Sequence, residues 1–228
     1  MVSAFVFDIG NVLLRFDFQV ALRRLMLQSR TPIEGLLEQI EPIKAAYEGA
    51  RIARPEFVQQ LFSLLGYRGN EADFVAAWED IFEENTPMTR LVLSLSKNYP
   101  LFLISNIGGI HVDFILKQFP FFQHFSDAVY SYQAGCSKPE PAIYELAIKK
   151  FGIVPQTTVF IDDLEANVSA ALDAGYQAIQ YDFRQHRVLL NELERRGVEI
   201  EEEIPIHPVR LQERTSPFLG ELVDSNHR

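Results

Sequence analysis

The stretch "FVFDIGNVLL" (residues 5–14) runs from apolar residues into a single carboxylate, Asp8, and then directly into Gly10 and Asn11. A short apolar run that ends at a turn sequence predicts a buried strand, and Gly-Asn is a favourable turn sequence. In α/β proteins, reactive groups gather at the carboxyl ends of parallel strands. Asp8 is therefore either an ordinary strand-end residue or the first member of a functional site.

Strand and helix patterns alternate through the second half of the chain. Helical spacing near residues 111–118, 140–151 and 165–174 separates short apolar runs. This alternation predicts an α/β fold whose core is a doubly wound (Rossmann-like) parallel sheet with helices on both faces. The predicted strands after the first are "LFLIS" (101–105), "DAVYS" (127–131), "TVFID" (158–162) and "YQAIQY" (176–181).

The region after the first strand has a helical pattern throughout. Asp17 is an N-cap candidate, a further helical pattern follows Asn70, and Thr31–Glu34 combines a capping-box spacing with proline at the first helical position. The apolar spacing predicts an inserted four-helix bundle. The predicted parts of the chain are an α/β core (1–16 and 88–203, with a last helix near 186–196), the helical insertion (17–87) and a C-terminal tail (204–228).

Composition narrows the class of partner. The 228 residues are 47% hydrophobic, enough for a sizeable core, and the net charge of −10 argues against binding to a nucleic-acid backbone. The chain shows no signal-peptide pattern, and no apolar run reaches the roughly 18 residues of a membrane span. The single cysteine, Cys136, cannot form an intrachain disulfide. We expect a cytoplasmic monomer or homodimer that binds a small metabolite, with no nucleic acid and no membrane.

Polar side chains follow several of the predicted strands. Ser105 and Asn106 end one strand, Asp162 and Asp163 end another, and Lys138 precedes a helix that starts with proline. Alone, each is an ordinary turn, cap or surface residue, but the carboxyl ends of parallel strands meet at one edge of a sheet. Carboxylates gathered there would repel one another without a cation, and Mg²⁺ prefers oxygen ligands and substrate phosphate. The set therefore predicts a Mg²⁺ site beside an anion-binding lysine.

Four motifs, in this order, resemble those of the haloacid dehalogenase-like (HAD) superfamily of hydrolases. They are "FDIGNVL" (7–13), "ISN" (104–106), "SKPEPAIY" (137–144) and "FIDDLEANVSAALDAG" (160–175). Each motif is short, and their combined order and strand-end placement make the resemblance specific. It extends to about residue 200. The helical insertion resembles the small four-helix cap that one subfamily places between motifs one and two.

The resemblance implies catalytic roles at the strand ends. Asp8 matches the nucleophile, which attacks phosphorus to form an aspartyl-phosphate that water then hydrolyses. Ser105 matches a hydroxyl that donates to a phosphoryl oxygen, and the backbone N–H of Asn106 matches a second contact to the substrate. Lys138 matches the cation that pairs with the nucleophile and the phosphate.

The resemblance also implies a Mg²⁺ site at the same edge. Asp8 and Asp163 match metal ligands, and Asp162 matches a second acid close to the metal. The family uses the backbone carbonyl at the position of Gly10 as a ligand, so glycine preserves it. Asn167, one helical turn further along, is expected to orient this loop.

Gly10 departs from the family pattern in one respect. Most phosphatases of the superfamily carry a second aspartate there for acid–base catalysis, which is typically worth roughly 10²–10⁴-fold. Some sugar-phosphate phosphatases that resemble this chain carry Gly-Asn instead. In the insertion, "AAYEGARIARPEF" (45–57) resembles the cap segment that faces the site. There Glu48 and Arg51 are candidates for substrate contact, and Glu48 is also a candidate for the missing acid.

Several functions are compatible with these residues. The leading hypothesis is a Mg²⁺-dependent phosphatase acting on a small phosphomonoester such as a sugar phosphate. The alternative, motivated by Gly10, is a non-catalytic relative that binds Mg²⁺ and a phosphorylated ligand or a partner protein. A 2-haloacid dehalogenase is disfavoured by the Asp162-Asp163 pair, because the dehalogenases of the family carry serines there. A mutase is disfavoured because the second aspartate is missing.

Overall fold

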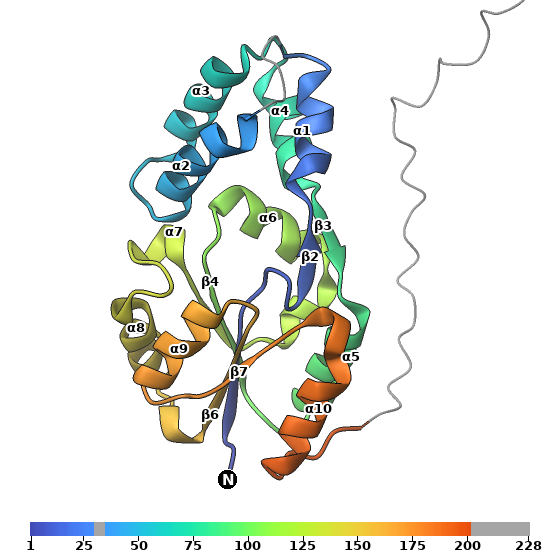
Figure 1. The fold of residues 1–228 in the computed structure, drawn as a ribbon, viewed down its shortest axis with the longest axis vertical. Coiled ribbons are helices and arrows are strands. Elements are labelled where there is room, and N and C mark those ends of the chain that lie inside the picture. The colour runs from blue at the N-terminus through green and yellow to red at the C-terminus, as the bar shows by residue number, and fades with distance from the viewer. Residues whose placement is uncertain (30–34, 202–228) are drawn as a thin grey trace, which may run out of the picture.

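The computed structural model describes residues 1–29 and 35–201. Within these residues a five-stranded parallel sheet has the strand order β5-β4-β1-β6-β7, so the first strand lies at its centre (Figure 1). The predicted α/β fold with a parallel, doubly wound sheet is confirmed. The strands of this sheet are β1 (Ala4–Phe7), β4 (Leu101–Ser105), β5 (Asp127–Tyr130), β6 (Thr158–Asp162) and β7 (Gln177–Gln180).

Helices cover both faces of the sheet, which explains why β1 is buried along its whole length. They are α5 (Thr86–Leu95), α6 (Gly109–Gln118), α8 (Pro141–Phe151), α9 (Glu165–Asp173) and α10 (His186–Arg195). Side chains of β1 alternate between the faces. Phe5 and Phe7 join an apolar core with α5, α6 and α10, whereas Ala4 and Val6 join a second core with α8 and α9.

The helices between residues 17 and 80 form a separate unit with its own apolar core. They are α1 (Phe18–Met26), α2 (Leu36–Glu48), α3 (Arg54–Leu65) and α4 (Glu71–Glu79). The helix α1 packs on α4 and α2 packs on α3, around buried Leu22, Phe57 and Trp78. Asp17 caps α1 as predicted, because its side chain accepts from Gln19 N at 2.8 Å. Asn70 caps α4 in the same way, accepting from Asp73 N at 2.9 Å. The predicted capping box at Thr31–Glu34 lies outside the described residues. The next residue, Gly35, directly precedes α2.

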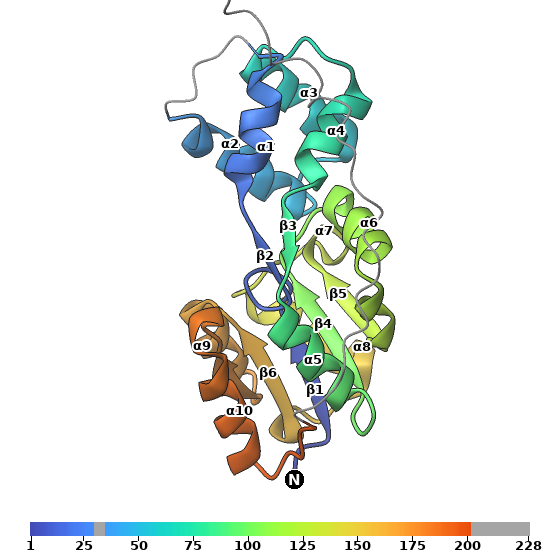
Figure 2. The same cartoon turned by 90° about the vertical axis from the view of Figure 1, so that its right-hand side faces the viewer.

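A short antiparallel ribbon joins the helical unit to the sheet. It consists of β2 (Leu14–Phe16) and β3 (Phe82–Glu84), and Figure 2 shows it between the two parts of the molecule. We did not predict this ribbon, because three residues are too few to show a strand period. It brings the two ends of the helical insertion side by side, so both connections to the core leave from one place.

Across residues 1–29 and 35–201, no helix combines the length and the apolar character needed to cross a membrane. The last helix predicted near 186–196 is α10. The predicted tail at 204–228 lies outside the described residues.

Candidate active site

Asp8 lies at the carboxyl edge of the sheet, between the ends of two neighbouring strands. Phe7 pairs with Leu103 of β4 and Ile161 of β6, so Asp8 comes level with the residues that follow these two. Ser105 is the last residue of β4, and Asp162 is the last residue of β6. The register of the sheet therefore gathers three predicted site residues, as expected for the carboxyl ends of parallel strands.

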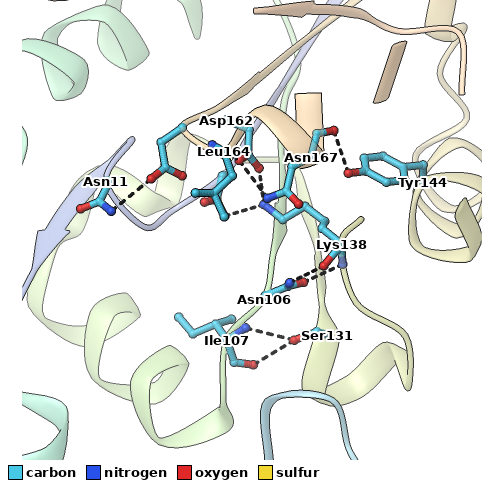
Figure 3. A network of polar contacts seen from close by, with 11 residues as sticks. Asn11, Asn106, Ile107, Ser131, Lys138, Tyr144, Asp162, Leu164 and Asn167 are labelled. Carbon is cyan, nitrogen blue, oxygen red and sulfur yellow. Dashed lines mark hydrogen bonds and ion pairs between the residues drawn. The ribbon is translucent and has the colours of Figure 1, made fainter. Parts of the chain in front are cut away.

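The turn after Asp8 connects the first motif to the fourth. Asn11 has a φ of 53°, in the left-handed region that asparagine tolerates better than most residues, and its N–H donates to Leu14 O at 2.7 Å. Its side-chain Nδ2 donates to Asp163 Oδ2 at 3.1 Å (Figure 3). The sequence indicated the turn but not this contact, since Asn11 and Asp163 are far apart in the chain.

Lys138 is buried between two carboxylates. Its Nζ lies 2.8 Å from Asp8 Oδ1 and 2.5 Å from Asp162 Oδ2, and its side chain is 1% exposed. These neighbours raise the pKa of Lys138 against the opposing effect of burial, so the ammonium stays charged. Asn106 holds the lysine in place, because its amide donates to Lys138 O and accepts from Lys138 N, both at 2.8 Å (Figure 3). The side chain of Asn106 is therefore occupied by Lys138, and the predicted substrate contact of Asn106 uses its backbone N–H instead.

Asp162 is fully buried, and polar partners surround it. Its Oδ1 accepts from Leu164 N and from Asn167 Nδ2, both at 2.9 Å, while its Oδ2 faces Lys138 (Figure 3). Asn167 thus contacts the loop that we expected it to orient. Asp162 thus holds the lysine and the loop together.

The carboxylates of Asp8, Asp162 and Asp163 form a cluster that could hold a metal ion, with one oxygen of each lying within 4.8 Å of the others. Burial is the main cause that raises the pKa of Asp8 to about 6, and Asp162 adds to it, while Lys138 and Ser105 act in the opposite direction. Burial likewise raises the pKa of Asp163, against the hydrogen bond from Asn11. A hard divalent cation would offset both the burial and the repulsion, so this all-oxygen set fits Mg²⁺.

A cavity of about 440 Å³ opens between this edge and the helical unit. Every site residue predicted from the sequence lines it except Asp162, which is buried behind Lys138. Glu48 and Arg51, predicted from the insertion, reach the cavity from the end of α2 and the following loop. The lining also includes Lys44, which we did not predict. Lys44 is spaced three and four residues from Glu41 and Glu48, which is also typical of a solvated helix face. The sequence therefore did not mark Lys44 as a site residue.

Phe16 occupies the space beside Gly10. A Cβ added at Gly10 would lie 2.9 Å from Phe16 Cε1, closer than a carbon–carbon contact allows. The ring belongs to β2 and lines the same cavity. A larger residue at position 10, including the aspartate usual in the family, would therefore require the ring to move.

A family model described as haloacid dehalogenase-like hydrolase matches residues 2–175. The chain therefore belongs to the haloacid dehalogenase-like hydrolases, and the resemblance drawn from its motifs is confirmed. Its curated relatives include a D-ribitol-5-phosphate phosphatase from Bacteroides thetaiotaomicron, 27% identical over 206 residues, which span 84% of this chain and 100% of the relative.

Solved structures agree with this assignment. A HAD family enzyme from Bacteroides thetaiotaomicron, in complex with magnesium and inorganic phosphate, matches with a TM-score of 0.73 and 26% identity over 80% of this chain and 95% of that one. A predicted HAD-like family hydrolase from Porphyromonas gingivalis matches with a TM-score of 0.72 and 26% identity over 85% of this chain and 98% of that one. The chain is thus similar to these proteins over nearly their whole length.

Proposed function

We propose that this protein is a Mg²⁺-dependent phosphatase that hydrolyses a small phosphomonoester through an aspartyl-phosphate on Asp8. The observation that carries the proposal is the placement of a buried lysine 2.8 Å from Asp8, with Asp163 at the edge of the same carboxylate cluster. A carboxylate, a fixed cation and a metal-binding edge are what nucleophilic attack on phosphorus requires. The name of the D-ribitol-5-phosphate phosphatase relative supports the same reaction.

Each residue has a role in this scheme. An oxygen of Asp8 attacks phosphorus, and the bond from phosphorus to the leaving oxygen breaks. Ser105 donates to a phosphoryl oxygen, and Lys138 offsets the charge that develops on the transferred group. Mg²⁺, held by Asp8, Asp163 and the backbone carbonyl of Gly10, would screen the repulsion between the phosphate and the carboxylate. Water then releases phosphate from Asp8.

We further propose that residues 17–87 act as a cap and that the organic part of the substrate is a sugar or polyol. Lys44, Glu48 and Arg51 give the wall opposite the sheet both signs of charge and many hydrogen-bonding groups. Such a wall suits a neutral polyhydroxy compound better than a second phosphate or an apolar chain. We also propose a monomer or homodimer in the cytoplasm, and the single cysteine, Cys136, suits such a reducing compartment.

The test is hydrolysis of p-nitrophenyl phosphate and of a panel of sugar and polyol phosphates that includes D-ribitol 5-phosphate. Each is measured with Mg²⁺, with EDTA, and with Asp8→Asn. We expect turnover that EDTA removes and that Asp8→Asn lowers to background. No metal-dependent turnover of any ester would contradict the proposal.

One observation favours a second candidate. The usual acid is absent at Gly10, and the Phe16 ring beside it would have to move before a side chain could occupy this position. A non-catalytic protein that binds Mg²⁺ and a phosphorylated ligand would show this feature. Binding of Mg²⁺ and inorganic phosphate by calorimetry, without turnover of any ester, would support that candidate.

A further inference from the structure

The cavity contains a carboxylate, Glu48, to which the proposed function gives no part in the reaction steps. Glu48 is the last residue of α2, and its side chain is only 14% exposed although it lines the same cavity as Asp8. Its Oε2 lies 3.3 Å from Lys44 Nζ, whose side chain is 15% exposed. A shielded carboxylate that lines the same cavity as a proposed nucleophile is a candidate for proton transfer.

The backbone of Glu48 is tied to the loop that follows Ser105 and Asn106. Ser131 begins the short helix α7 (Ser131–Ala134), which packs against α2. Its Oγ accepts from Ile107 N at 3.0 Å and donates to Glu48 O at 2.5 Å. A single hydroxyl therefore sets the position of Glu48 relative to the proposed phosphate-binding loop (Figure 3 shows its contact with Ile107).

The residue before Glu48 provides a second attachment. Tyr47 OH accepts from Ile110 N at 3.1 Å, and its ring lies directly over Gly108. A Cβ at Gly108 would lie 2.4 Å from Tyr47 Cε1, so only glycine allows this approach. Two hydrogen bonds from the core, through Ser131 and Ile110, thus hold the end of α2 at the cavity, and rigid support of this kind suits a catalytic group.

The surroundings of Glu48 raise the pKa of its carboxyl group. Burial raises the pKa of Glu48 to about 7, against the lowering effect of Lys44, and Glu41 adds repulsion. The carboxyl end of a helix also disfavours a negative charge, and the last turn of α2 carries no basic residue. The other charged groups of this cavity are Glu41, Arg51, Asp8, Asp163, Lys138 and Glu140. Those of α3 and α7, namely Arg54, Glu56 and Tyr132, line the neighbouring cavity.

The other carboxylates of the cavity are less suited to this role. Glu41 is 62% exposed, so solvent screens it. Glu140 is exposed, and its Oε1 accepts from Ser137 N at 3.2 Å at the start of α8. Asp8 and Asp163 are assigned to the nucleophile and the metal. Among the described residues of the cavity, Glu48 is therefore the carboxyl group best placed to carry a mobile proton.

We propose that Glu48 is the general acid and base of this phosphatase, replacing from the helical unit the aspartate that is missing at Gly10. The inference rests on the proposed function. In the first step, Asp8 bonds to phosphorus, the bond to the leaving oxygen breaks, and that oxygen takes its electron pair and the Glu48 proton to leave as an alcohol. In the second, the Glu48 carboxylate takes a proton from water, whose oxygen bonds to phosphorus as the bond to Asp8 breaks, which restores both carboxyl groups.

The test compares two leaving groups in Glu48→Gln, which keeps the size of the side chain but has no proton to transfer. The substrates are p-nitrophenyl phosphate, which needs little protonation, and the alkyl phosphate of the panel that the wild type hydrolyses fastest. We expect Glu48→Gln to lose roughly 10²–10⁴-fold on the alkyl ester and only a few-fold on formation of the phospho-enzyme from the aryl ester, measured as a p-nitrophenol burst. Glu41→Gln, which removes the other carboxylate paired with Lys44, is the matched control and should change both esters by the same factor.

A pH profile separates proton transfer from positioning. Activity of the wild type on the alkyl ester should fall as pH rises through about 7, because Glu48 then loses the proton it donates. This alkaline limb should be absent in Glu48→Gln, whose thermal unfolding should match that of the wild type. Equal losses on both esters, or an unchanged alkaline limb, would overturn the role of Glu48 alone. Wild-type turnover of the aryl ester without any alkyl ester would do the same, whereas no metal-dependent turnover at all would overturn the proposed function with it.

Discussion

Lys138 is the residue on which the charge balance of the site depends. It lies between Asp8 and Asp162 at 2.8 and 2.5 Å, and all three side chains are buried. A buried ion pair need not stabilise a protein more than apolar residues would. Removing only one partner of such a pair is strongly destabilising, because the remaining charges are then buried without compensation.

We therefore expect Lys138→Met to abolish turnover and to lower the free energy of unfolding by about 3–5 kcal/mol. Urea unfolding followed by circular dichroism measures the second effect. Lys150→Met is the matched control, since Lys150 pairs with Asp127 at 2.8 Å while 43% exposed, and an exposed pair is worth at most about 1 kcal/mol. Similar losses in the two variants would show that the carboxylates of Asp8 and Asp162 are not left uncompensated when Lys138 is removed.

Gly10 and Phe16 form the second residue-scale feature, because the ring leaves too little room for a Cβ. Gly10→Asp should cost about 1–3 kcal/mol of stability through overpacking and should not raise activity on alkyl phosphates. Combining it with Phe16→Ala should recover much of that stability, and a double-mutant cycle measures the coupling. Additive effects of the two substitutions would mean that the ring moves aside without cost.

At the scale of elements, the helical unit meets the core where α4 lies against α6. His111 of α6 is buried, stacks on the Trp78 ring with centroids 5.8 Å apart, and donates from Nε2 to Trp78 O at 3.1 Å. Burial lowers the pKa of His111 to about 4. This histidine is thus neutral in the folded protein over a pH range in which the unfolded chain binds a proton.

The protein should therefore lose stability in acid, and part of this loss should come from the protonation of His111. A histidine whose folded pKa is lowered contributes stability above its unfolded pKa of about 6.5, and that stability is lost as pH falls towards 4. The loss attributable to His111 should approach about 3 kcal/mol. Unfolding free energies at pH 7 and 4.5 for the wild type and His111→Phe test this, because other groups titrate in both proteins. An equal pH dependence in the two would exclude His111 as its source.

At the scale of the whole molecule, the proposed Mg²⁺ site would couple metal binding to folding. Asp8, Asp162 and Asp163 come from two strand ends that meet only in the folded sheet, so the unfolded chain lacks the site. Mg²⁺ should therefore stabilise the fold, by about 2.7 kcal/mol at a hundred times its Kd. Thermal unfolding with MgCl₂ and with NaCl of equal ionic strength measures this. Asp163→Asn should remove most of the difference in unfolding temperature between MgCl₂ and NaCl. An equally large difference in that variant would mean that the ion binds elsewhere.

Much of this molecule could be predicted from local pattern. Short apolar runs that alternate with helical spacing indicated the parallel sheet. Asp8, Ser105 and the Asp162-Asp163 pair stand at the ends of such runs, and Lys138 stands before a helix that starts with proline. The cap at Asp17 was equally local. These features depend on neighbours within a few residues, and parallel pairing then brings the strand ends to one edge whatever the loops between them do.

The tertiary structure decided how distant segments meet within that edge. It tied Asn11 to Asp163, surrounded Asp162 with Lys138, Leu164 and Asn167, and laid the Phe16 ring over Gly10 through a ribbon too short to predict. It also joined Glu48 to Ser131 and shielded its carboxyl group. Sequence alone determined the residues available for chemistry, because strand ends are local. Which of them touch, and what burial does to their charges, depends on packing between segments that no local pattern connects.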